Sequence, residues 1–198
     1  MKIFEEKKFN IGELSGISAK NIEEHLKLYS GYVKNANLVR EKLGKLYQED
    51  PAGNAFLIGE LHRRFAFEFN GVRNHEYYFQ SLSGGAKPLP ANSKLKAELE
   101  KDVPMDVFIE AFKQMAATRG IGWAVMAWDQ ATGQLVTSWI DEQHLGQLNG
   151  AKWILALDMW EHSYIYDYAS SEKKKYIDTF FQNLNWEEIE KNFVEATK

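Results

Sequence analysis

The sequence contains no cysteine. This absence excludes disulfide bonds, thiolate nucleophiles, iron–sulfur clusters and zinc sites built from cysteine. Any metal ion in this chain must therefore be held by histidine, aspartate or glutamate.

The sequence also lacks long apolar segments and runs of lysine or arginine. No segment approaches the roughly 18 consecutive apolar residues of a membrane-spanning helix, and residues 1–8 carry charges where a signal peptide needs its apolar segment. With 24 basic against 28 acidic residues, the net charge is −4, which argues against nucleic-acid binding. We therefore expect a cytoplasmic protein with neither membrane nor nucleic acid as a partner.

Apolar and aromatic residues are plentiful, at 44% and 14% of 198 residues, and this is enough for a folded core. In the first half, apolar positions at helical spacing predict a helix over about residues 19–49, with Ser18 as its N-cap, and a second helix over residues 54–82. Glycine and proline then interrupt the pattern. We expect residues 1–86 to form an antiparallel helical hairpin domain.

The pattern changes after this linker, and we expect residues 87–198 to form a C-terminal α/β domain. Its expected elements are helices over 93–101 and 104–120, strands over 123–128, 134–140 and 153–157, and helix from Met159 to the C-terminus. The first two strands flank a turn and predict an antiparallel hairpin. The fold class is therefore α+β: an N-terminal antiparallel helical hairpin is followed along the chain by a three-stranded antiparallel sheet with flanking helices.

Three of the five histidines suggest a metal site: His25, His75 and His162 lie in apolar, aromatic surroundings, and Asp158 stands four residues before His162. Neutral imidazoles with one carboxylate suit Mn, Fe, Zn or Cu and leave a coordination position open. The alternative is a structural role, in which Asp158 caps a helix and the histidines are buried in the core with hydrogen-bond partners.

The helix of His25 carries two phenols on the same face, because at about 100° per residue Tyr29 and Tyr32 lie about 40° and 20° from His25. These phenols indicate either a functional site or a buried face of the helix whose hydroxyl groups find hydrogen-bond partners nearby. On the second helix, His62 points about 140° away from His75 and is expected at the surface. Gly71 shares the face of His75, although an interior glycine costs about 1 kcal/mol relative to alanine. Either a side chain from another segment, such as the loop 141–144, needs that space, or the glycine merely permits close helix packing.

Four motifs, in order, resemble those of the iron/manganese superoxide dismutases over nearly the full chain. Asp158-Met159-Trp160-Glu161-His162 is similar to the family's Asp-x-Trp-x-His signature. The other three matches are Asn74-His75 with the aromatic residues after it, Gly120-Ile121-Gly122-Trp123, and Tyr32-Val33-Lys34-Asn35-Ala36-Asn37.

The resemblance implies that one Fe or Mn ion per subunit is bound between the two domains by His25, His75, Asp158 and His162. It further implies that Tyr32 stands at the substrate entrance and that Trp123 forms a wall of the site. Gln143 would hydrogen-bond the metal-bound solvent, with Gly71 in the complementary place on the second helix, and the adjacent His144 is the alternative for that role. Glu161 would reach across the interface of a homodimer, or of a tetramer built from dimers, to orient the His162 imidazole of the other subunit.

The sequence departs from the family pattern at two linked positions. Tyr29 holds the place of a histidine four residues after the first ligand, and Ile165 replaces a tyrosine that pairs with this histidine across the interface. The expected function is an antioxidant oxidoreductase that disproportionates superoxide to dioxygen and hydrogen peroxide. The alternatives are a catalytically weak or inactive metal-binding scaffold of the same fold and, with less support, a hydrolytic metal enzyme.

Overall fold

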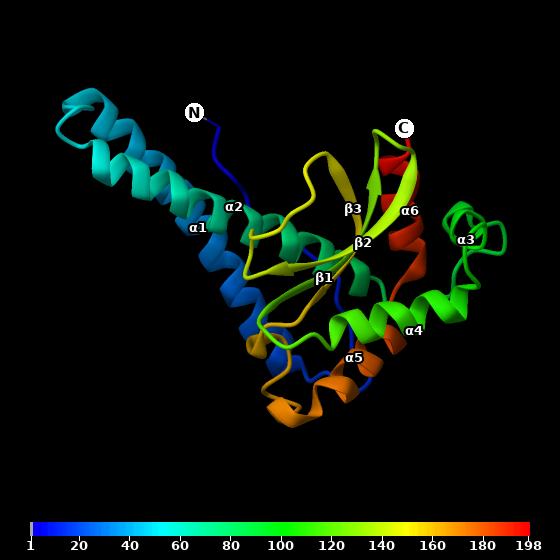
Figure 1. Ribbon diagram of the computed structural model, residues 1–198. Coiled ribbons are helices and arrows are strands. Elements are labelled where there is room, and N and C mark those ends of the chain that lie inside the picture. The colour runs from blue at the N-terminus through cyan, green and yellow to red at the C-terminus, as the bar shows by residue number, and fades with distance from the viewer. Residues whose placement is uncertain (1) are drawn as a thin grey trace.

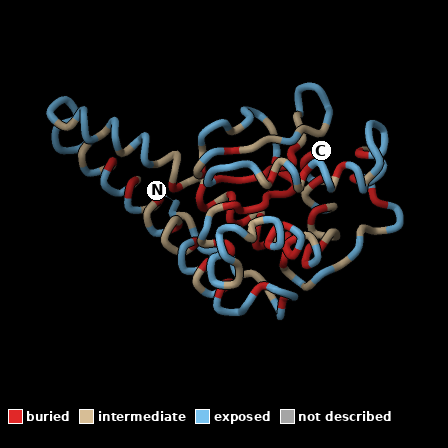
Figure 2. The backbone as a smooth tube through the Cα atoms, turned by 60° about the horizontal axis from the view of Figure 1, so that its bottom comes forward, coloured by how far each residue is buried: buried red, intermediate tan, exposed pale blue. Residues whose placement is uncertain are grey.

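Two long helices form an antiparallel hairpin in the computed structural model, which describes residues 2–198. They are α1 (Ala19–Glu49) and α2 (Ala55–Leu82), and Figure 1 shows them side by side, projecting from the rest of the molecule. The Ser18 side chain caps α1 by accepting a hydrogen bond from the Asn21 backbone N–H. The far end of the hairpin is largely exposed (Figure 2): the buried residues of α2 lie between Glu68 and Leu82, whereas those of α1 form a stripe that continues to Leu43.

Three antiparallel strands make the sheet, as the sequence predicts: β1 (Gly122–Asp129), β2 (Gln134–Asp141) and β3 (Ala151–Asp158). Their spatial order is β2-β1-β3, so β1 is the central strand. The apolar runs of β1 and β3 are buried almost throughout, which explains why these strands read as continuous apolar segments and not as an alternation.

Helices cover the sheet, and the α+β fold class is confirmed. The remaining helices are α3 (Lys94–Leu99), α4 (Met105–Ala116), α5 (Lys173–Gln182) and α6 (Trp186–Ala196). Both α2 and α6 pack against β3, and α4 contacts β1 and β2. Figure 2 shows the buried backbone gathered in the sheet and in the helical segments beside it. No helix within residues 2–198 has the length and apolar character needed to cross a membrane.

The prediction of continuous helix from Met159 onward is wrong. The chain first makes two short 3₁₀ turns, η1 (Glu161–Ser163) and η2 (Ser170–Glu172), before α5 begins. Asp158 Oδ1 accepts from the Trp160 N–H, and the Ser163 hydroxyl donates to the carbonyl of Trp160. Such side-chain bonds to the backbone compete with helical hydrogen bonding. The second short helix of this domain also ends early, at Ala116 instead of residue 120.

Candidate metal centre

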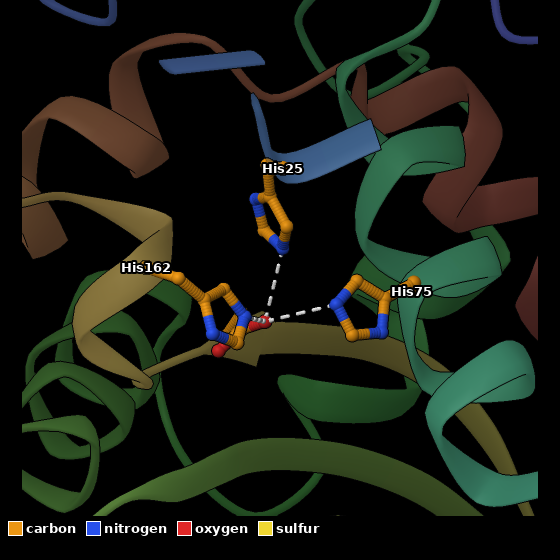
Figure 3. A group of neighbouring side chains, drawn as sticks. His25, His75 and His162 are labelled. Atoms are coloured by element: carbon orange, nitrogen blue, oxygen red, sulfur yellow. Dashed lines mark hydrogen bonds and ion pairs between the residues drawn. The ribbon is translucent and has the colours of Figure 1, made fainter. Parts of the chain in front are cut away.

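Three imidazoles converge on a single carboxylate oxygen. The Nε2 atoms of His25 and His162 each lie 3.2 Å from Asp158 Oδ2, and His75 Nε2 lies 3.6 Å from the same oxygen. Figure 3 shows the three rings entering from different sides and pointing at one position. The structure therefore brings together the four residues that the sequence predicts as ligands.

Each of the four comes from a different element. His25 and His75 lie on α1 and α2, Asp158 is the last residue of β3, and His162 lies in η1. The register of β1 and β3 places Trp123 opposite Asp158, and the Asp158 carboxylate contacts His25 and His75 of the helical hairpin. The carboxylate is thus fixed by the sheet, while the hairpin supplies two of the imidazoles.

Burial controls the protonation of these groups. His25, His75 and Asp158 are fully buried, whereas the His162 side chain is 21% exposed. Burial lowers the pKa of His25 and lowers that of His75 to about 3, and the neighbouring histidines add to the effect on His75. Burial acts to raise the pKa of Asp158, but the charge of His162 and hydrogen bonds from His162 and His25 outweigh it and hold this pKa below its usual range. The cluster therefore offers the neutral imidazoles of His25 and His75 and an ionised carboxylate at neutral pH.

The donor atoms fit one metal ion. One potential ligand atom from each of the four residues lies within 4.8 Å of the others. His75 Nδ1 lies 2.6 Å from the carbonyl oxygen of Gly71, while His75 Nε2 is buried without a hydrogen-bond partner. A carbonyl oxygen only accepts, so the proton sits on Nδ1 and the Nε2 lone pair is left for a metal. Three imidazoles and one carboxylate form a site that could hold one Fe or Mn ion.

A hydrogen-bonded layer lies next to the four candidate ligands. Gln143 is fully buried; its Oε1 accepts from Trp123 Nε1 at 3.0 Å and its Nε2 donates to the Tyr32 hydroxyl at 3.0 Å. The rings of Tyr32 and Trp123 lie 5.0 and 5.1 Å from the His75 ring. Burial, followed by the charge of Asp158, raises the pKa of Tyr32 well above its ordinary value. Tyr32 therefore keeps its hydroxyl proton beside the metal cluster.

Gly71 is needed because of Tyr32. A Cβ atom built at Gly71 would lie 2.4 Å from Tyr32 Cδ1, so any larger residue would displace this ring. A side chain from another segment does need this space, as one of the two expectations has it, but the side chain is Tyr32 of α1 and does not come from the loop 141–144. The Gln143 side chain of that loop contacts the other end of Tyr32, at its hydroxyl.

The remaining sequence candidates lie at the margins of the cluster. His144 is half-buried with its ring edge-on to Phe67 at 5.7 Å, and its Nδ1 has no partner. His62 is exposed at the hairpin, as predicted, and pairs with the Tyr47 hydroxyl. Glu161 is exposed, and its carboxylate accepts from the Ser170 hydroxyl.

Two further side chains fix the site, and the sequence analysis assigns a contact to neither of them, although Asn74 is part of the Asn74-His75 motif. Asn74 Nδ2 donates to the Gln143 carbonyl at 2.9 Å and so anchors the loop that carries Gln143. The Tyr176 hydroxyl donates to the Asp158 carbonyl at 3.0 Å. Asn74, a polar residue beside a candidate ligand, carried a signal for such a role, whereas no pattern in the sequence singles out Tyr176.

Comparison with known proteins agrees with this geometry. Residues 91–192 match the C-terminal domain of the iron/manganese superoxide dismutases. An iron superoxide dismutase of Aquifex pyrophilus is 34% identical over 190 residues, which span 93% of this chain and 88% of that protein. The chain belongs to this family.

Relatives named for either metal are similar over most of the chain. An iron superoxide dismutase of Cupriavidus metallidurans is 32% identical, over 94% of this chain and 93% of its own length. A manganese superoxide dismutase of Mycolicibacterium smegmatis is 30% identical, over 87% of this chain and 82% of its own. The buried cluster of His25, His75, Asp158 and His162 could hold one such metal ion.

Proposed function

We propose that this chain is a superoxide dismutase that converts two superoxide ions and two protons to dioxygen and hydrogen peroxide. The observation that carries the proposal is the convergence of three imidazole Nε2 atoms on one oxygen of Asp158. His25, His75, Asp158 and His162 would hold one Fe or Mn ion. The ion, when bound, supplies the one-electron exchange by alternating between its trivalent and divalent states.

The chain's own contribution is to position charge and protons. Asp158 brings one negative charge to a site in which burial keeps His25 and His75 neutral, and the buried surroundings strengthen the field of this charge. Gln143 Nε2 donates to the Tyr32 oxygen, which leaves the Tyr32 proton free to point elsewhere. We assign to Tyr32 the role of holding this proton for the superoxide ion that is reduced to hydrogen peroxide. Gln143 would orient solvent in the site, and Trp123 fixes the Gln143 amide.

We further propose a homodimer, or a tetramer built from dimers, in which Glu161 orients the partner subunit's His162. The exposure of Glu161, the partial exposure of His162 and the exposed apolar residues Ile165 and Tyr166 support this arrangement. Sedimentation tests it, because Ile165→Glu should then shift the chain toward monomer. A cytoplasmic location is likewise a proposal, which cell fractionation tests.

The division into domains 1–86 and 87–198, with the metal between them, is also proposed. Its support is that His25 and His75 come from the first segment, and Asp158 and His162 from the second.

The test of function is superoxide consumption by protein stripped of metal and reloaded separately with Fe and with Mn, with metal counted per subunit. Near-unit occupancy with activity is expected, and the same assay ranks the two metals. His162→Ala should lose most of the bound metal, and full occupancy in that variant would contradict the ligand set. Unit occupancy without turnover would favour the inactive scaffold instead.

A further inference from the structure

Two unpaired polar atoms lie one helical turn apart near the metal cluster. Among residues 2–198, the buried side-chain polar atoms without a hydrogen-bond partner are His25 Nδ1, Asn21 Oδ1, His75 Nε2 and His144 Nδ1. His75 Nε2 faces the proposed metal position and is explained by it. The first two atoms belong to α1, to residues four apart, and one of them is a nitrogen and the other an oxygen. Buried polar groups are nearly always paired, so this coincidence calls for a physical reason.

His75 shows how a candidate ligand of this chain is held. Its Nδ1 pairs with an oxygen of the residue four positions earlier, the Gly71 carbonyl, while its Nε2 faces the cluster. Such a bond from the second ring nitrogen fixes the tautomer and the orientation of a metal-binding imidazole. His25 has no equivalent bond, although its Nε2 also faces Asp158 and its Nδ1 points away from the cluster (Figure 3).

Asn21 occupies the corresponding place before His25. It is fully buried, and its Nδ2 donates to Asp167 Oδ2 at 3.0 Å. The same carboxylate oxygen accepts from the Ser18 N–H at 2.8 Å. Because an ionised carboxylate only accepts, this contact fixes the amide with its nitrogen toward Asp167 and its oxygen free. Side chains four apart on a helix have Cβ atoms about 5–6 Å apart, so the Asn21 oxygen is within reach of the His25 ring.

We propose that Asn21 is the positioning residue for His25, and that its amide oxygen accepts the Nδ1–H of this imidazole when metal is bound. This inference rests on the proposed function, because it needs a metal ion at His25 Nε2. In the metal-free chain the neutral ring donates Nε2–H to Asp158 and has no proton on Nδ1, so His25 Nδ1 and Asn21 Oδ1 are both acceptors and both stay unpaired. Metal binding at Nε2 moves the proton to Nδ1, and the Asn21 oxygen then holds it there.

The arrangement extends to the other candidate ligands. Asp167 follows His162 by five residues, so the bonds from Asp167 to Asn21 and Ser18 fasten the start of α1 to the segment that carries His162. A carboxylate, an amide and an imidazole would then form a chain of hydrogen bonds that ends at the metal.

The test follows the His25 tautomer by nitrogen NMR on protein labelled with ¹⁵N-histidine, with Zn²⁺ as a diamagnetic probe. The signals are assigned by their loss in His25→Gln. We expect the proton on Nε2 without metal, and on Nδ1 and protected from exchange with one equivalent of Zn²⁺. In Asn21→Ala the Nδ1 proton should exchange faster, and the affinity for Zn²⁺ should fall about 10- to 100-fold.

Asn37→Ala is the matched control. Asn37 lies on the same helix, three turns beyond His25, and its amide fastens α1 to the Phe4 backbone in a comparable way. This variant should bind Zn²⁺ as the unmodified chain does. An Asn21→Ala protein with unchanged affinity and unchanged exchange would overturn the proposal. So would a His25 Nδ1 that stays unprotonated in the Zn²⁺-loaded unmodified chain, a result that needs no variant. An unmodified chain that binds neither Zn²⁺, Fe nor Mn would instead remove the metal centre itself and the function proposed for it.

Discussion

Gln143 joins two aromatic side chains at the edge of the metal cluster, accepting from Trp123 and donating to Tyr32. The sequence predicts a polar contact from either Gln143 or His144, but spacing alone cannot distinguish two adjacent loop residues. The structure does so through packing, because the Gln143 amide is fully buried between its partners while the His144 ring lies against Phe67.

We predict that Gln143→Ala keeps most of the metal but loses activity by about 10- to 100-fold, the usual effect of removing a partner that orients groups around a metal. The loss should be accompanied by a changed visible spectrum of the Fe-loaded or Mn-loaded protein. His144→Gln is the control and should leave both readouts close to those of the unmodified chain. Unchanged activity and spectrum in Gln143→Ala would show that Gln143 has no contact with the solvent in the site.

Gly71 gives a second prediction at this scale. Gly71→Ala should destabilise the protein by about 1–3 kcal/mol through overpacking, because the new Cβ would meet the Tyr32 ring. Gly59 is the control on the same helix, since a Cβ there has no neighbour within 4 Å. Gly59→Ala should therefore stabilise by up to about 1 kcal/mol through helix propensity. Denaturant unfolding of the two variants compares them directly, and equal stabilisation by both would contradict the close approach of Tyr32.

Three elements meet at the hydroxyl of Tyr29, which stands where the family pattern has a histidine. Tyr29 is 1% exposed; its oxygen accepts from the Lys7 N–H at 2.9 Å and donates to Glu76 Oε1 at 3.4 Å. The Glu76 carboxylate is also paired with the Lys7 and Arg73 side chains. Tyr29 thus fastens α1 to α2 and to the N-terminal arm within its own chain, while Ile165 is 47% exposed.

Tyr29→Phe should lower the free energy of unfolding by about 1–2 kcal/mol, because it leaves the Lys7 N–H without its acceptor while keeping the ring. Burial, with the nearby Glu76 charge, raises the pKa of Tyr29 to about 12, so the hydroxyl is protonated across the range in which the protein is handled. Tyr47→Phe serves as the comparison: this exposed phenol is hydrogen-bonded to His62, and the loss of its hydroxyl should change stability by less than about 0.5 kcal/mol. Equal effects of the two substitutions, measured by urea unfolding, would mean that the Tyr29 bonds contribute nothing.

At the scale of the whole molecule, periodicity and turn signals were sufficient for the hairpin and the sheet, because α1, α2 and the three strands bury regular apolar patterns. The segment after Asp158 is not continuous helix, because local bonds from the Trp160 N–H to the Asp158 side chain and from the Ser163 hydroxyl to the Trp160 carbonyl compete with helical hydrogen bonding, and apolar periodicity does not reveal such bonds. The four candidate ligands were predictable from residue type and from the resemblance. The contacts of their outer partners, such as Tyr176 and Asn74, join segments that are distant in the sequence, so that only the structure reveals them.

Burial of the metal cluster couples the stability of the whole metal-free protein to pH. The pKa of His75 is lowered to about 3 and that of His25 is lowered as well, against 6.5 for the exposed group. Between these two pKa values the histidines are protonated in the unfolded chain but not in the folded chain. Their contribution to the free energy of unfolding is therefore complete above about pH 6.5 and is lost as the pH falls toward 3. Asp158 acts in the same direction, because its pKa lies below the ordinary value of 3.8, and its contribution is lost below about pH 4.

The free energy of unfolding of the metal-free chain should therefore decrease from pH 7 to pH 4, by up to about 1.4 kcal/mol per pH unit for each buried histidine. Urea unfolding at intervals of half a pH unit measures the slope. His75→Gln removes one titrating group and should flatten the slope, whereas His62→Gln, at the exposed end of the hairpin, should leave it unchanged. The same slope in both variants would mean that His75 does not couple folding to pH. Metal adds to this dependence, because protons compete with it for the same nitrogen atoms, and the stabilisation by excess Mn²⁺ should be larger at pH 7 than at pH 5.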